Sequence, residues 1–145
     1  DGALQNAWND TTVTIATATV PKLDERKKHP SGVFRNPEKE RRIIDYFMNQ
    51  HDAVERAIYG VTKYVKEYWP SDVLVGVFNG YFFYHNGGFN TGGHLAFDKI
   101  LKNPYIDFIA SPYSYSEAAR EAGGTSQPRA VIESINLHGK LFMTR

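Results

Sequence analysis

The sequence contains no cysteine among its 145 residues, so it offers neither a disulfide framework nor a thiolate metal site. It also has no apolar stretch near the roughly 20 residues that a membrane-spanning helix needs, and no basic-then-apolar signal pattern at its start. We therefore expect a soluble protein without membrane insertion. The compartment stays open, with secretion or export to a periplasm as one option.

An excess of charge of one sign is missing as well. Seventeen basic and sixteen acidic residues leave a formal charge of +1. The basic residues are scattered, apart from short clusters at residues 26–28 and 41–42. Nucleic-acid binding usually requires a basic patch or stripe. We therefore expect no nucleic-acid partner.

Cofactor motifs are absent too. The Gly-rich segment HNGGFNTGGH, residues 85–94, precedes a predicted helix, a place where anions can bind. It lacks the lysine of a P-loop and the GxGxxG dinucleotide pattern, and the five histidines form neither HExxH nor HxH. We expect no cofactor and no metal, and interpret the segment as a substrate-side loop. A nucleotide-binding domain that uses this loop is the weakest alternative.

The length fits one domain, residues 1–145, that buries roughly two-thirds of its unfolded surface. Residues 1–35 are predicted to form an extended N-terminal connection after a short helical start, and residues 36–145 carry helix–strand repeats. Asn36 as a cap, followed by Pro37, predicts a helix of about thirty residues. That helix should run to Glu67 or Tyr68, with a kink near Gly60 as an open alternative.

Three apolar runs predict strands, at residues 72–83, 105–116 and 140–145, each expected to be buried on both faces. Helices are predicted between them at residues 94–103, with Leu95 on the apolar side, and at residues 126–137, with Gly139 just beyond its end. This alternation is typical of an α/β fold with right-handed βαβ units and a parallel sheet. Three such strands need more sheet beside them, so we expect a portion of a larger protein. Its open sheet edges predict self-association.

Polar side chains gather at the predicted carboxyl ends of the strands, where α/β proteins place their chemistry. Asn79 and Tyr81 follow the first strand, Ser111 and Tyr113 follow the second, and Arg145 stands near the end of the third. Hydroxyls, amides and aromatic faces suit carbohydrate recognition. They would equally suit a loop that only closes a barrel.

The carboxylates divide between the two ends of the predicted strands. Glu117 and Glu121 follow the second strand at its carboxyl end, whereas Asp107 begins that strand and so faces the opposite end. Asp52, on the long helix, is expected on its solvated side. His51, on the same helix, is interpreted as a structural residue.

Five segments occur in an order that carries a resemblance. They are LQNAWND…VTIATATVP…ER, GVFRNPEKERRIIDYFMNQHDAVERAI, VLVGVFNGY, GGHLAFDKILKNPYIDFIASPYSY and ESINLHGKLF. Together they resemble the second half of the catalytic barrel in glycoside hydrolases similar to family 42 β-galactosidases. The similarity covers nearly the whole chain.

The resemblance implies a partial (β/α)8 TIM barrel whose fifth, sixth and seventh strands begin at Val73, Ile106 and Lys140. In that family one glutamate after the fourth strand is the acid/base, and one at the end of the seventh is the nucleophile. The mapping puts the first before Asp1 and the second beyond Arg145, so no catalytic residue is expected in this chain. A retaining glycosidase needs both carboxyl groups, roughly 5 to 5.5 Å apart, so we expect this portion to be inactive alone.

The resemblance also implies a carbohydrate substrate, contacted by Asn79, Tyr81, Ser111, Tyr113 and Arg145. The sequence departs from the family in the HNGGFNTGG loop and in SPYSYSEAAREAGG, which leaves the sugar and its linkage open. A non-catalytic carbohydrate-binding or scaffold protein with a half-barrel fold is the alternative.

Overall fold

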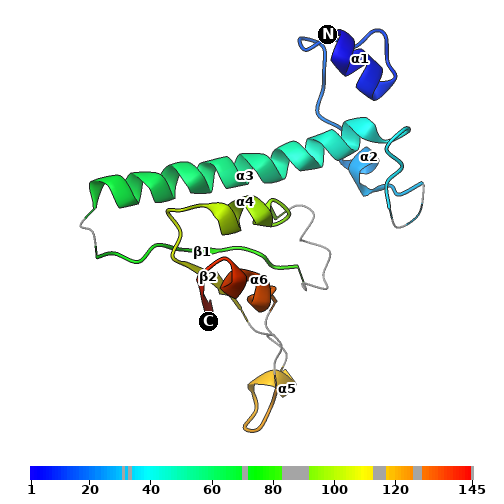
Figure 1. The fold of residues 1–145 in the computed structure, drawn as a ribbon. Helices are drawn as coiled ribbons and strands as arrows, with labels where there is room; N and C mark the ends of the chain where they lie inside the picture. Colours follow the sequence, from blue (N-terminus) through cyan, green and yellow to red (C-terminus); the bar gives the residue numbers. More distant parts are fainter. Residues whose placement is uncertain are drawn as a thin grey trace. The chain divides into compact units, whose positions relative to one another are not determined.

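The computed structural model describes residues 1–30, 32, 34–69, 72–82, 92–112, 117–125 and 129–144. The chain divides into two compact units, Asp1–Asn49 and Gln50–Arg145. The long helix α3, Arg41–Tyr68, contributes its first turns to the first unit and the rest to the second (Figure 1). The expectation of one domain over residues 1–145 stays a prediction.

The first unit is more helical than the extended connection expected for residues 1–35. Helix α1, Gly2–Trp8, is the predicted helical start, and it ends at Asn9 in the left-handed conformation with a φ of 51°. Helix α2, Leu23–Lys27, was not predicted. Its first turn is closed by Glu25, whose carboxylate accepts the backbone N–H of Lys22 at 2.6 Å. Five residues gave too short a pattern to find from the sequence.

Helix α3 has 28 residues and ends at Tyr68 as predicted, but it begins at Arg41 rather than beside Asn36. Asn36 does act as a cap, because its side chain accepts the backbone N–H groups of Glu38 and Lys39 at 2.8 and 3.3 Å. The carboxylate of Glu40 in turn accepts the N–H of Asn36 at 2.9 Å. These bonds close a separate turn ahead of the helix. The helix continues without a break through Gly60.

Three short parallel strands form the sheet of the second unit, in the order β1-β2-β3. They are β1 (Gly76–Phe78), β2 (Phe108–Ser111) and β3 (Leu141–Thr144). Helices α4 (Phe97–Lys102), α5 (Glu117–Arg120) and α6 (Ile132–Leu137) follow the first two strands. The predicted α/β class and the parallel sheet are confirmed, although the strands are shorter than the apolar runs that predicted them.

One face of the sheet meets the core. Val77, Ile109 and Phe142 lie level across the three strands and point to the same side. Ile109 is fully buried, and Val77 and Phe142 pack against the same cluster. The buried members of that cluster are Phe97, Ile100, Leu101, Ile106, Ile109, Ala130 and Ile135.

The opposite face is exposed where the sequence predicts burial. Phe78, Leu141 and Met143 are 53%, 55% and 41% exposed, so the expectation of burial on both faces is wrong for β1 and β3. Leu95, predicted on the apolar side of its helix, precedes α4 and is also exposed. Apolar runs show which side chains favour burial, but not which element covers them.

Helix α6 ends as predicted. Gly139 has a φ of 68°, and its N–H donates to the carbonyl of Asn136 at 2.9 Å, while the N–H of Lys140 donates to the carbonyl of Ile135 at 3.2 Å. This pair of bonds is the Schellman motif, which favours glycine at its left-handed position. Among the described residues, no helix has the length and apolar character to cross a membrane.

Candidate functional site

The structure brings two of the predicted site residues to neighbouring positions at the carboxyl end of the sheet. Phe78 pairs with Ala110, so the next residues, Asn79 and Ser111, lie level with each other. Ser111 also pairs with Thr144, which the sequence reasoning missed. We call Asn79, Ser111 and Thr144 the strand-end row. Thr144 could have been found by aligning the polar fourth residues of β2 and β3.

The structure describes one of the three other predicted substrate contacts. Tyr81 is described and half-buried. Tyr113 and Arg145 lie outside the described residues, as does most of the Gly-rich loop, residues 83–91. Their proposed roles stay predictions.

Within the strand-end row, Asn79 and Ser111 are 2% and 0% exposed. The side chain of Asn79 accepts the N–H of Gly80 at 2.8 Å, and the hydroxyl of Ser111 donates to the carbonyl of Pro112 over a long 3.5 Å. Both side chains are therefore placed to shape the backbone at the strand ends. The accessible surface for a ligand comes from their neighbours.

That surface includes the rings of Tyr81 and His94, which stack with centroids 4.6 Å apart and planes inclined by 26°. Two glycines fix the backbone beside this pair. Gly80 has a φ of 82°, and a Cβ there would lie 2.7 Å from the ring of Phe97. Gly93 has a φ of 78°, and a Cβ there would lie 2.6 Å from the side chain of Val54. Both positions require glycine for conformation and for space.

His94 is held in its neutral form near neutral pH. Burial lowers its pKa, and the neighbouring His51 lowers it further. His51 is itself buried on α3 and its Nδ1 accepts the backbone N–H of Leu95 at 3.4 Å. The Nδ1 atom of His94 is buried and finds no hydrogen-bond partner in the described parts of the chain. Since Nδ1 is closed to solvent, a hydrogen bond from this neutral imidazole to a ligand hydroxyl would have to use Nε2.

The carboxylates at this end of the sheet are solvated. Glu117 on α5 and Glu121 after it are both exposed. No group of three His, Asp or Glu side chains able to hold a metal ion occurs among the described residues. Apart from these two exposed glutamates, the described groups at this end are neutral amide, hydroxyl, phenol and imidazole, all of which can bond a ligand hydroxyl.

The amino end of the sheet has the charged groups, in a structural arrangement. As the sequence predicts, Asp107 lies at this end, where its carboxylate accepts the N–H of Val75 at 2.7 Å and pairs with Lys66 at 2.6 Å. Buried Lys140 donates to the carbonyls of Asn103 and Ile106 at 2.8 and 2.7 Å. Burial lowers the pKa of Lys140, and Asp107 opposes that shift. Polar groups at this end of an α/β sheet are usually concerned with stability.

Comparison with known proteins gives no family for this chain, because no family model, curated protein or solved structure matches it. Functional inference therefore depends on the geometry of the site.

Proposed function

We propose that this chain is a portion of a retaining glycoside hydrolase with a (β/α)8 barrel, to which it contributes three consecutive strands. The observation that supports this is the uncovered apolar face of β1 and β3, on which Phe78 and Leu141 are more than half exposed. In such barrels, helices cover the outer face of the sheet, while side chains from all eight strands fill the interior. An apolar inner face is then completed by the other strands of the barrel.

The proposed substrate is a carbohydrate. Tyr81 and His94 form a stacked aromatic pair beside the carboxyl end of β1, where barrel enzymes bind their substrates. Aromatic faces pack against the apolar face of a sugar ring, and the phenol and imidazole can bond its hydroxyls. The two glutamates that cleave the glycosidic bond come, in this proposal, from other parts of a longer protein.

The test uses a longer protein that includes this chain with sequence on both sides. It should hydrolyse an aryl β-galactoside or a related aryl glycoside, and Tyr81→Ala should lower kcat/KM about tenfold, chiefly through KM, because a ring contact is lost. Tyr68→Ala, which removes an exposed tyrosine at the end of α3, is the matched control and should leave kcat/KM unchanged. Flanking sequence without a glutamate at either adjoining strand end would refute the proposal.

A non-catalytic carbohydrate-binding protein is the second candidate. It is favoured by the burial and neutral character of Asn79 and Ser111, which carry no carboxyl group, and by the exposure of Glu117 and Glu121 to solvent. This alternative predicts heat of sugar binding in calorimetry with no hydrolysis, even by the longer protein. Turnover of an aryl glycoside would exclude it.

A further inference from the structure

A separate pocket of about 280 Å³ lies within the first unit. All of its lining residues belong to that unit: Trp8, Asp10, Thr12, Val13, Thr17, Thr19 and Arg42. The volume is near the lower end of the roughly 300–1,000 Å³ typical of small-ligand sites. No residue of the strand-end row takes part, so the pocket is a different site from the one considered above.

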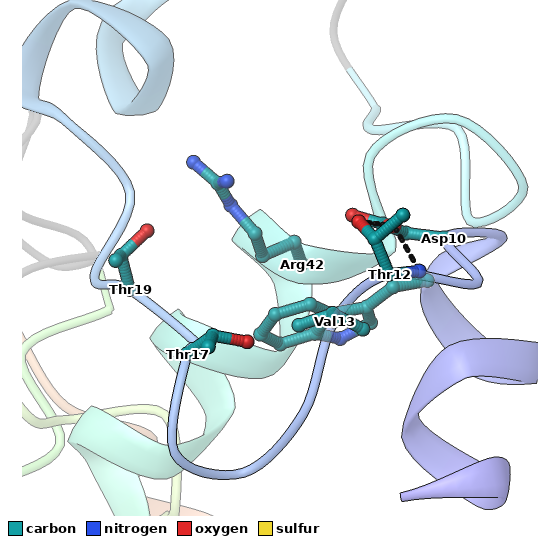
Figure 2. A pocket seen from close by; sticks show the side chains of 7 residues that line it. Asp10, Thr12, Val13, Thr17, Thr19 and Arg42 are labelled. Carbon is teal, nitrogen blue, oxygen red and sulfur yellow. Dashed lines mark hydrogen bonds between the residues drawn. The ribbon is translucent and has the colours of Figure 1, made fainter.

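Hydroxyl groups dominate the polar lining. Figure 2 shows Thr17 and Thr19 on one side of Arg42, with Asp10 and Thr12 on the other. Thr17 is engaged with Thr14, whose backbone N–H donates to its hydroxyl at 2.9 Å. The hydroxyl of Thr19 has no hydrogen bond to any other described residue. It is therefore available as both donor and acceptor.

Asp10 supplies an acceptor of fixed orientation. Its Oδ1 atom accepts the hydroxyl and the backbone N–H of Thr12, at 2.6 and 2.9 Å, as Figure 2 shows. These hydrogen bonds lower the pKa of Asp10, and the bond from the hydroxyl has the largest effect. The carboxylate is therefore ionised at neutral pH. Both Thr12 bonds use Oδ1, and the backbone N–H of Val13 also favours the ionised carboxylate. A carboxylate has about four lone-pair sites, so Asp10 keeps acceptor capacity for a ligand hydroxyl.

The aromatic part of the lining is also held in place. The indole Nε1 of Trp8 donates to the carboxylate of Asp45 at 2.9 Å, and the same carboxylate accepts Nε of Arg41 at 2.8 Å. A tryptophan ring with a satisfied N–H presents its remaining surface for apolar contact. Indole surface next to several hydroxyls matches a ligand that has both CH groups and hydroxyls.

Charge argues against an anionic ligand. The guanidinium of Arg42 is the basic group of the lining, and its Nη2 already donates to both carboxylate oxygens of Glu25 at 2.9 Å. With Asp10 ionised, these three groups sum to a negative charge. A phosphate or carboxylate would therefore meet net repulsion.

We propose that this pocket binds a neutral polyhydroxylated ligand of hexose size, with its hydroxyls bonded to Thr19 and Asp10 and its CH groups against Trp8. The inference does not depend on the proposed glycosidase, because it is drawn from the first unit alone. Only the chemistry of the lining identifies the ligand class.

The test uses the fluorescence of the full chain. Its two tryptophans are Trp8 and the exposed Trp69, so Trp69→Phe leaves Trp8 as the single reporter. Titration of this variant with methyl β-D-galactoside and methyl β-D-glucoside should give a saturable change in emission with at least one of them. Adding Thr19→Val should weaken that binding about tenfold, as expected for one lost hydrogen bond, and Asp10→Asn should weaken it as well.

Thr11→Val is the matched control, since Thr11 is an exposed threonine of the same segment that does not line the pocket, and its binding should equal that of the Trp69→Phe parent. Tyr81→Ala should also leave binding unchanged, which separates this site from the strand-end site. Line broadening of the glycoside protons in NMR gives a second readout that does not depend on the indole. The proposal is overturned by the absence of saturation in both readouts, by equal losses in the Thr11 and Thr19 variants, or by tighter binding of inorganic phosphate.

Discussion

Lys66 and Asp107 form an ion pair of 2.6 Å that joins helix α3 to the start of strand β2. The same carboxylate accepts the N–H of Val75 just before β1, so one side chain connects a helix and two strands. Lys140, which precedes β3, contacts the carbonyl of Ile106 at this end. The amino ends of all three strands are thus held by a small set of charged groups.

Asp107→Asn should lower the free energy of unfolding by about 1–2 kcal/mol at pH 7, because it removes a charge-assisted bond to a side chain that is only partly solvated. Urea denaturation followed by circular dichroism measures this. Asp98→Asn is the matched control, since Asp98 pairs with Lys102 but both side chains are mostly exposed. Its effect should stay within about 0.5 kcal/mol. Equal effects of the two substitutions would contradict the structural role of Asp107.

The Asp107 contribution should also depend on pH. Burial acts to raise the pKa of this carboxyl, but the bonds from Lys66 and Val75 outweigh it and the pKa is lowered. A lowered folded-state pKa means that the stabilisation is present above the unfolded value of about 3.9 and lost as the pH falls further. The gap between wild type and Asp107→Asn should therefore shrink below about pH 4.

Two glycine-to-alanine substitutions should change the free energy of unfolding in opposite directions. Gly139→Ala places a side chain at a φ of 68° and should cost about 1–2 kcal/mol, although space is available. Gly60→Ala lies within α3, also with open space around it, and should stabilise by about 0.5–1 kcal/mol. Thermal unfolding measures both. A stabilising Gly139→Ala would show that the Schellman turn does not form.

Local chemistry accounts for what the sequence could predict of the fold. Gly139 identified a helix end, because few residues other than glycine adopt a left-handed conformation at low cost. The alternation of helices and apolar runs predicted the parallel sheet, because only a crossover can join parallel neighbours. The start of α3 was misplaced because Asn36 and Glu40 satisfy each other in a turn that precedes the helix. A cap signal alone does not distinguish these two arrangements.

The candidate site was less predictable, because it depends on contacts between distant parts of the chain. Tyr81 was found as a polar aromatic after a strand, but its partner His94 lies beyond the Gly-rich loop. The pair meets through the backbone conformations of Gly80 and Gly93, and each glycine is required by a packing neighbour that sequence spacing does not reveal. The burial of Asn79 likewise follows from tertiary packing.

His94 should make stability depend on pH in the mildly acidic range. Its folded-state pKa is lowered by burial and then by His51, so between that value and the ordinary value near 6.5 the unfolded chain binds a proton that the folded chain does not. Stability should therefore fall as the pH drops below about 6.5, and His94→Asn should reduce this slope. Urea midpoints at several pH values measure it. His29→Asn, at an exposed histidine, is the control and should keep the wild-type slope.

The exposed sheet face should promote self-association. Among the described strands, β1 and β3 lie at the edges of the sheet, and the exposed Met143 on β3 adds apolar surface beside an edge with which no other described strand pairs. Light scattering coupled to gel filtration should show species larger than a monomer at tens of micromolar. Met143→Lys should shift the chain toward the monomer by adding charge to the edge strand. Leu137→Lys makes a similar change at a more exposed apolar residue on α6, the helix that packs on the core face of the sheet, and should leave the distribution unchanged. A monomeric wild type at the highest concentration would instead mean that the sheet edges are protected within the chain itself.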